Sequence, residues 1–346
     1  MKITLKNFLT AGALSALLLM PLHGAAQADD AIREVNVYSY RQPNLVKPLF
    51  DAFTAETGIA VNMVFAKKGM VERLKAEGAA SPADLIFTVD IGRLIGAVEA
   101  DVTQPVASET LAANIPAAYR DPANNWFGLT TRARVLFAAK DRVGADDLLS
   151  YDELAEPEWK GRICTRSGAH PYTIALIASL ITHWGEEKTE DWLRGVKKNL
   201  ARKPQGNDRG QVKAIKEGLC DVSFGNTYYM GKMLANEEQR PWADAVRVVF
   251  PNQADRGTHV NISGMALAKH APNRDNAVKL MEYLSSDAAQ ALYAEQNFEY
   301  PVKPGVAWSP VVEEWGRFKA DKAPLAEIAK NRPAALLLVN KVGFDH

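Results

Sequence analysis

Two adjacent tyrosines, Tyr228 and Tyr229, are the residues whose types and position most suggest chemistry. They follow the strand-like run 220–224 and lie at the start of a predicted helix. Asn226 or Thr227 can cap that helix, so both tyrosines occupy its first turn, where free backbone N–H groups and the positive end of the dipole favour an anionic group. Because adjacent helical residues point about 100° apart, two long phenol side chains there can converge on one atom.

The chemistry of a phenol narrows what that atom could be. A phenol titrates near pH 10, so its ionisation at neutral pH requires a strong cation. Fe³⁺ is hard and highly charged, and it prefers oxygen donors to soft sulfur. The pair therefore predicts a ferric iron site. An equally weighted interpretation is that the two rings line a cleft for a sugar or an amino acid, and the residue types alone leave both open.

Motifs of the common enzyme classes are absent from the sequence. It has no G-x-S-x-G nucleophile elbow, no G-x-x-x-x-G-K-[ST] phosphate loop and no G-x-G-x-x-G after the first predicted strand. Scattered Asp and Glu residues have no spacing that singles out an acid–base pair. No two histidines have H-x-x-x-H spacing, so a zinc or copper site built on histidine is poorly supported. We expect surface or capping roles for the histidines beyond the first 28 residues, which are His170, His183, His259, His270 and His346.

The first 28 residues have the pattern of a secretory signal peptide. Lys2 and Lys6 precede and flank an almost wholly apolar run, 8–22, and small residues then lead to Ala28, after which we expect cleavage. The run is too short and wrongly flanked for a transmembrane helix, and no cysteine follows it to carry a lipid. No second apolar stretch of membrane length occurs. We therefore expect an exported, soluble protein without a membrane anchor.

The overall composition is that of an ordinary globular protein. The chain has 346 residues, is 47% hydrophobic and 24% charged, and its length suggests two domains. Its 41 basic and 41 acidic residues balance, and loss of the two leader lysines leaves 39 against 41, a net charge of −2. A nucleic-acid-binding protein usually has a basic excess, so we expect no nucleic-acid partner.

Export also affects what the two cysteines predict. Cys164 and Cys220 each lie in a strand-like run, 162–165 and 220–224. In an oxidising compartment an even pair is a disulfide candidate, whereas two unpaired buried thiols are the alternative. A bond that closes this loop would contribute roughly 4 kcal/mol in the chain-entropy model.

Hydrophobic patterning predicts strands that alternate with helices in the first part of the chain, which favours parallel pairing there. The predicted strands are 34–39, 59–65, 83–89, 128–139, 162–165, 220–224, 246–251 and 259–269. The predicted helices are 45–53, 71–77, 91–99, 173–181, 189–199, 208–217 and 228–236, followed by a helical tail. Two α/β units with long extended segments between them indicate two lobes and a hinge that the chain crosses more than once. Ligands of such open α/β sheets bind at the carboxyl ends of the strands, here in the cleft between the lobes.

The segment 225–229, Gly-Asn-Thr-Tyr-Tyr after a strand, resembles the periplasmic ferric-ion-binding proteins of bacterial ABC importers, the transferrin-like class of type II periplasmic binding proteins. The resemblance extends over essentially the whole chain beyond the leader. It is also carried by the segments 37–42, 81–84, 131–135 and 161–168, with Tyr172 shortly after the last of them.

The resemblance implies a set of iron ligands. Position by position, it assigns Tyr172, Tyr228 and Tyr229 to the metal, and three phenolates would balance the charge of Fe³⁺. Many relatives add a histidine ligand from the loop after the first strand, where this sequence has Gln42 and Pro43. The chain is therefore similar to the class that uses three tyrosines and a small anion. Tyr40 is a further candidate ligand, although strand alternation could direct it elsewhere.

The same resemblance implies an anion site. Arg41 and Arg132 would hold a synergistic anion such as carbonate, because guanidinium pairs bidentately with planar oxyanions, and Gln42 could add a hydrogen bond. The alternative for both arginines is a surface salt bridge.

The fold implied is an α/β periplasmic binding protein of type II with two lobes, each a mixed sheet flanked by helices. The N-terminal lobe is expected to comprise 29–130 and about 256–305, and the C-terminal lobe, which carries the tyrosines, about 131–255 and 306–346. The implied function is a periplasmic, monomeric, non-enzymatic binding component that captures Fe³⁺ and delivers it to an inner-membrane ABC permease.

Three other functions are alternatives. A periplasmic binding protein for an organic or oxyanion ligand would use the tyrosines for stacking or hydrogen bonds. A secreted hydrolase would need a carboxylate pair assembled in space, which no motif supports. A purely structural partner-binding module would leave the aromatic residues at a helix start unexplained.

Overall fold

The structure is a computed structural model that describes residues 33–346. The predicted signal peptide, residues 1–28, lies outside the described residues. Between residues 33 and 346, no helix is both long and apolar enough to cross a bilayer.

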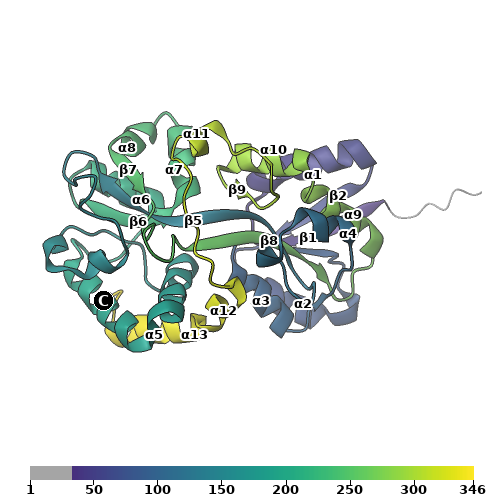
Figure 1. Ribbon diagram of the computed structural model, residues 1–346. Coiled ribbons are helices and arrows are strands. Elements are labelled where there is room, and N and C mark those ends of the chain that lie inside the picture. The colour runs from purple at the N-terminus through teal and green to yellow at the C-terminus, as the bar shows by residue number, and fades with distance from the viewer. Residues whose placement is uncertain (1–32) are drawn as a thin grey trace, which may run out of the picture. The chain divides into compact units, whose positions relative to one another are not determined.

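Strands and helices alternate through much of the described chain, and most of them coincide with the predicted segments (Figure 1). The strands are β1 (Glu34–Ser39), β2 (Ala60–Phe65), β3 (Leu85–Thr88), β4 (Thr103–Gln104), β5 (Phe127–Ala139), β6 (Val222–Asn226), β7 (Val246–Val249), β8 (Val260–Ala268) and β9 (Tyr300–Pro301). The first helices are α1 (Pro43–Thr57), α2 (Met70–Glu77), α3 (Ile91–Glu99), α4 (Glu109–Asn114), α5 (Pro171–Asn199), α6 (Asp208–Lys216) and α7 (Thr227–Leu234). The remaining helices are α8 (Arg240–Asp244), α9 (Arg274–Leu284), α10 (Asp287–Asn297), α11 (Pro310–Glu313), α12 (Leu325–Lys330) and α13 (Arg332–Val342).

The sheet is mixed, as expected for this α/β fold. β1 pairs in parallel with β2 and with β3, so the parallel pairing predicted for the start of the chain is correct. β3 is antiparallel to β8, and β8 is antiparallel to the first half of β5. The second half of β5 pairs antiparallel with β6 and β7. β5 therefore runs from one group of strands into the other (Figure 1).

Alternation along β1 explains how its sheet separates two layers of helices. Val35 and Val37 are fully buried in a cluster with residues of α1 and α9. Tyr38, the next residue on the opposite face, belongs to the cluster that includes Leu74 of α2 and Leu94 of α3. Because successive strand residues point to opposite faces, a strand that is buried on both sides must lie between two helical layers.

One prediction about local structure needs correction. The segment 162–165 is not a strand, because only Ile163 pairs, through isolated parallel bridges to Leu200 and to Val222 of β6. The two helices predicted at 173–181 and 189–199 are confirmed, because the helical stretch α5 is broken at Gly185, whose φ is 79° and ψ 172°. Glycine readily adopts a positive φ of this kind, so it separates the two helices there.

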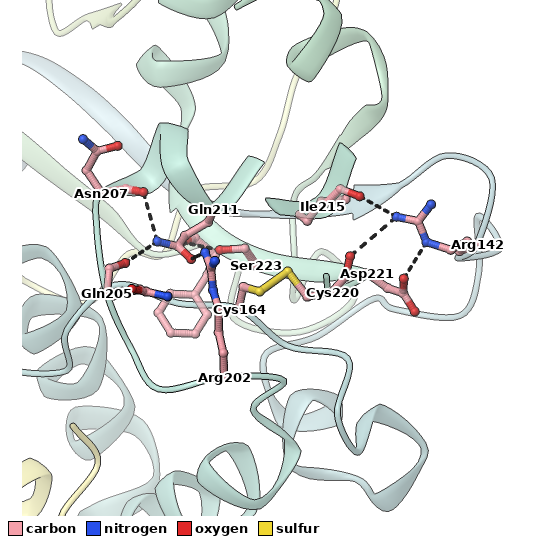
Figure 2. The surroundings of a disulfide bond; sticks show 11 residues. Arg142, Cys164, Arg202, Gln205, Asn207, Gln211, Ile215, Cys220, Asp221 and Ser223 are labelled. Carbon is pink, nitrogen blue, oxygen red and sulfur yellow. Dashed lines mark hydrogen bonds and ion pairs between the residues drawn. A yellow bond between two sulfur atoms is a disulfide. The ribbon is translucent and has the colours of Figure 1, made fainter. Parts of the chain in front are cut away.

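The predicted disulfide is confirmed. Cys164 and Cys220 are bonded, with their Cα atoms 5.8 Å apart, and both are buried. Figure 2 shows the bond between the segment that leads to α5 and the segment that leads to β6. The Cys164 backbone N–H also donates to the Val222 carbonyl at 2.9 Å, so the two segments are held by a covalent bond and a hydrogen bond.

Candidate functional site

The tyrosine pair lies at the junction between β6 and α7. The rings of Tyr228 and Tyr229 lie 4.2 Å apart between centroids, and both residues are in the first turn of α7. Gly225, just before this turn, lets β6 pack closely on β5, because a Cβ there would lie 2.3 Å from the Phe137 ring. Of the two predicted capping residues, Asn226 and Thr227, Asn226 occupies the N-cap position, but α7 has no side-chain cap hydrogen bond. The side-chain oxygen of Asn226 instead accepts a hydrogen bond from Arg134 at 3.2 Å.

Tyr172 reaches the pair from the start of α5. Its phenol oxygen lies 3.4 Å from that of Tyr228, so the two oxygens can approach one ligand atom. His170 caps α5, because its Nδ1 accepts a hydrogen bond from the Tyr172 backbone N–H at 3.2 Å. Burial, assisted by Arg166, lowers the pKa of His170 to about 3, so its ring is neutral at pH 7 and can act as this acceptor. The capping role expected for His170 is therefore present.

The phenols of the pair are protonated in the metal-free protein. Burial raises the pKa of Tyr228 well above 10, and the neighbouring Tyr172 and Tyr229 raise it further. Burial also raises the pKa of Tyr229, followed by the negative charge of Asp208. Between residues 33 and 346, no cluster of His, Cys, Asp or Glu side chains could hold a metal ion. A metal bound here would therefore have to be held by phenolates that its own charge ionises.

The two predicted anion-binding arginines are buried rather than on the surface. Arg41 forms an ion pair with Glu299 at 2.6 Å, and it donates to the hydroxyl of Ser263 at 3.2 Å. Burial lowers the pKa of Arg41, but the Glu299 carboxylate, together with Tyr293 and Tyr228, more than offsets this and raises it. Arg132 donates to the same Ser263 hydroxyl at 2.9 Å, and its guanidinium lies 5.9 Å from the Tyr172 ring centroid.

The two arginines differ in the hydrogen-bonding capacity that remains. Arg132 is 1% exposed, and its Nε and Nη2 have no hydrogen-bond partner within the described chain. In Arg41, only the Nε lacks a hydrogen-bond partner within the described chain. Buried guanidinium N–H groups are normally satisfied, so Arg132 in particular has free donors for an added acceptor.

Asp208 is a second buried carboxylate, and it binds the backbone just before the tyrosine pair. Asp208 accepts from Arg134 at 2.6 Å, from Arg166 at 3.0 Å and from the backbone N–H of Asn226 at 3.0 Å. Burial raises the pKa of Asp208, but the two guanidinium groups lower it by more, so the carboxylate is ionised. The Arg166 guanidinium also lies 5.6 Å from the Tyr172 ring centroid. This network joins α6 to the junction that positions Tyr228 and Tyr229.

A cavity of about 320 Å³ opens in front of the tyrosines. Its lining residues come from the β1–α1 loop and α1, from the end of β3, and from the starts of α5, α6 and α7; they are Tyr40, Arg41, Gln42, Asn44, Leu45, Val89, Tyr172, Arg209, Tyr228, Tyr229 and Lys232. Gln42 therefore borders the cavity, whereas Arg132 is not one of its lining residues. Tyr40 also borders it, but its hydroxyl accepts hydrogen bonds from the backbone N–H groups of Met70 and Val71 at 3.1 and 3.2 Å.

The cavity has more positive than negative charge on its walls. Burial lowers the pKa of Lys232, and the charges of Arg41 and Arg209 also contribute to the lowering. The guanidinium of Arg209 lies 5.9 Å from the Tyr229 ring centroid and makes no ion pair within residues 33–346. The cavity is therefore suited to a ligand with anionic oxygen groups.

Sequence reasoning missed Asp208, Glu299, Arg209 and Lys232. Glu299 is a fully buried carboxylate between the aromatic residues Phe298 and Tyr300, and a lone acid in an apolar context is the signal that could have drawn attention to it. Its partner could not have been found in this way, because Arg41 lies 258 residues away in the sequence.

Comparison with known proteins identifies clear relatives. Residues 80–320 match the family described as bacterial extracellular solute-binding protein. The chain is 46% identical to Iron uptake protein A1 of Synechocystis sp. over 315 residues, which is 90% of this chain and 88% of that protein. It is similar to the crystal structure of apo ferric ion-binding protein A of Pasteurella haemolytica, with 56% identity, a TM-score of 0.87, and coverage of 91% of this chain and 99% of that one. It is also similar to a Trichodesmium protein whose structure is in complex with iron and citrate ligands, with 43% identity, a TM-score of 0.86, and coverage of 90% and 99%.

Proposed function

The chain belongs to the bacterial extracellular solute-binding proteins, and we propose that it is the periplasmic component of an ABC importer that binds ferric iron and delivers it to the membrane permease. The observation that carries this proposal is the convergence of three phenol groups on one cavity, with the oxygens of Tyr172 and Tyr228 3.4 Å apart. Its relatives include an iron uptake protein, a ferric ion-binding protein and a protein in complex with iron and citrate, which supports iron as the cargo. The chain is a solute-binding protein and not an enzyme.

The proposed iron ligands are Tyr172, Tyr228 and Tyr229. Three phenolates supply hard oxygen donors and a total charge of −3, which balances Fe³⁺ and leaves softer or less charged ions at a disadvantage. We do not include Tyr40, because its hydroxyl oxygen already accepts two backbone hydrogen bonds. Since Tyr228 and Tyr229 are protonated before binding, capture of iron releases protons and its affinity rises with pH.

An anion completes the proposed site. Three ligands leave part of the coordination sphere of Fe³⁺ open, and Arg132 has two free buried donors beside the tyrosines. Carbonate is planar and fits the bidentate geometry of a guanidinium group. Citrate, which accompanies iron in the Trichodesmium structure, has the same carboxylate chemistry and is the other candidate. Gln42 and the Nε of Arg41 are the additional donors proposed for either anion.

The proposed lobes are the ones expected from the sequence, with a hinge in β5 and β8. The pairing of β5 supports this division, because Ala133 faces Val260 of β8 whereas Arg134 faces Asn226 of β6. We propose that the lobes close over the cargo, since contacts made only in the closed state favour that state when the ligand is bound. Export to the periplasm through a cleaved leader and action as a monomer complete the proposal.

The colour of the loaded protein tests the cargo. The purified protein, incubated with ferric salt and bicarbonate, is expected to gain a visible phenolate-to-iron absorption band that a ferric chelator removes. Iron should also raise the thermal midpoint, because a ligand that binds only the native state stabilises it, by about 4 kcal/mol at 1,000 times Kd. A colourless protein whose thermal midpoint is unaffected by iron would refute the proposal. The variant Tyr119→Phe, which removes a phenol outside the cavity, is the control and should behave as wild type does.

A further inference from the structure

An ion pair between Asp90 and Arg332, neither of which is a proposed iron ligand, links two walls of the cavity. Asp90 directly follows Val89, which lines the cavity, and Arg332 is the first residue of α13, which packs on α5. Arg332 Nη1 lies 3.1 Å from Asp90 Oδ1. The same nitrogen donates to the carbonyl oxygen of Pro171 at 3.5 Å, and Pro171 immediately precedes Tyr172. Arg332 therefore touches both the wall that contains Val89 and the start of the helix that presents Tyr172.

Several hydrogen bonds hold Asp90 in the wall that contains Val89. Its carboxylate is fully buried, and its Oδ1 caps α3 by accepting the Gly92 backbone N–H at 2.9 Å. Its Oδ2 accepts from the side chain of Asn261 at 2.8 Å, and Asn261 lies on the hinge strand β8 opposite Arg132 of β5. Because Arg332 is only 20% exposed, the attraction between the two charges is screened less than at an open surface.

The chain makes room for this contact at one glycine. A Cβ on Gly92 would lie 2.1 Å from Arg332 Nε and 2.5 Å from its Cζ. Gly92 lies in α3, where alanine would be the better helix former, so the local helix gives no reason for glycine. The close passage of the arginine side chain does give one.

We infer that the Asp90–Arg332 ion pair is a latch that holds the cavity closed and thereby limits how fast the cargo leaves. Opening moves the α3 wall away from α5 and α13, which separates the pair and leaves a buried carboxylate without its cation. A contact that exists in only one of two states shifts the equilibrium toward that state. Arg332 is therefore a positioning residue: it acts on the iron through lobe closure and through the start of α5. The inference rests on the proposed function wherever iron is the readout.

Release of iron tests the latch directly. The iron-loaded Arg332→Gln protein, mixed with a ferric chelator, should lose its visible band about five- to tenfold faster than wild type, as for a moderate coupling energy. Arg332→Lys, which keeps the charge, should recover part of the slow release. The control is Lys330→Gln, which removes an exposed ion pair with Glu327 in α12. Equal release rates for Arg332→Gln and wild type, or equal acceleration in the control, would overturn the inference.

A second variant separates the latch from fold stability. Gly92→Ala keeps every charge and favours the helix, while its added methyl group displaces the Arg332 side chain. We expect faster iron release, as in Arg332→Gln, while urea denaturation of the ligand-free protein measures how far the better helix former offsets the displaced ion pair. Unchanged release from this variant would also contradict the latch.

A measurement without iron distinguishes failure of the latch from failure of the proposed cargo. Spin labels at Ala55→Cys on α1 and Glu238→Cys near α8 report the separation of the lobes, because both residues are exposed and the native cysteines are bonded to each other. Pulsed dipolar spectroscopy of the ligand-free protein should show a short-distance population that Arg332→Gln reduces. If wild type binds no iron, this measurement still decides the latch. A single long-distance distribution in ligand-free wild type would refute it.

Discussion

The phenol oxygens of Tyr172 and Tyr228 lie 3.4 Å apart, although 56 residues separate them in the chain. The same 56 residues separate Cys164 from Cys220, whose Cα atoms lie 5.8 Å apart across the disulfide. Each of these tyrosines therefore follows its cysteine at the same distance along the chain, so the two segments are fastened in register at two points. The positions of the phenols should depend on the disulfide, even though neither cysteine borders the cavity.

Removal of the disulfide should affect both the fold and the cargo. The double variant Cys164→Ala/Cys220→Ala is expected to lose about 4 kcal/mol of unfolding free energy, because a loop of this length regains its conformational entropy in the unfolded state. Urea denaturation of the ligand-free protein measures this loss. Iron release to a chelator, compared in buffer without urea at a temperature where both proteins are folded, should also be faster. A lower stability with unchanged release would mean that the disulfide supports the fold alone.

Replacing any of the three proposed ligand tyrosines should weaken iron binding, whereas replacing Tyr40 should not. Tyr172→Phe, Tyr228→Phe and Tyr229→Phe each remove one proposed ligand, so each should weaken binding by more than the roughly 10- to 100-fold that loss of an outer-sphere partner causes. Titration against a competing chelator, followed at the visible band, measures the affinity. Tyr40→Phe is the comparison: it should keep the band and instead lose about 1–3 kcal/mol of stability, because two backbone N–H groups of α2 lose their acceptor. Loss of the band in Tyr40→Phe would return this residue to the ligand set.

The local part of the site could be predicted from the sequence, and the long-range part could not. The strand–turn–helix that presents Tyr228 and Tyr229 is encoded within one short segment, and so is α3, whose bounds match the predicted 91–99. The ion pair of Arg41 with Glu299 depends instead on which strands become neighbours. The sequence shows the two charges but not their contact, since loop and strand geometry over 258 residues decides it.

The predicted strand around Cys164 failed for the same reason. Its residues have strand-like patterning, but only Ile163 pairs, through isolated bridges to Leu200 and to Val222 at the start of β6. β-Propensity reports how well a segment fits a pleated surface, and it does not decide how far the pairing with a neighbouring strand extends.

The two buried arginines should have separable roles. Arg41→Gln leaves the Glu299 carboxylate buried without its cation, so we expect a loss of about 3–5 kcal/mol in unfolding free energy. Arg132→Gln removes a side chain with one hydrogen bond, to Ser263, and should cost only about 1 kcal/mol. Its main effect should be on the anion: bicarbonate or citrate, added to anion-free buffer, should strengthen iron binding by wild type but much less by Arg132→Gln. An unchanged anion effect in that variant would place the anion elsewhere.

Acid should destabilise the ligand-free protein through His259. This side chain is 1% exposed, and burial, together with the charges of Arg256 and Arg134, lowers its pKa to about 3 despite the opposing effect of Asp321. An unfolded histidine titrates near pH 6.5, so below that pH the unfolded chain gains a proton that the folded chain does not. The stability that the neutral ring contributes is therefore complete above pH 6.5 and is lost progressively as the pH falls toward 3, by at most about 1.4 kcal/mol per pH unit. Urea denaturation between pH 6.5 and 5, above the range in which most carboxylates titrate, measures this slope. His259→Gln should reduce the slope but not abolish it, because the pKa of His170 is also lowered to about 3, whereas His270→Gln, at an exposed position, should leave it unchanged. A slope in His259→Gln as steep as in wild type would show that other groups cause the acid sensitivity.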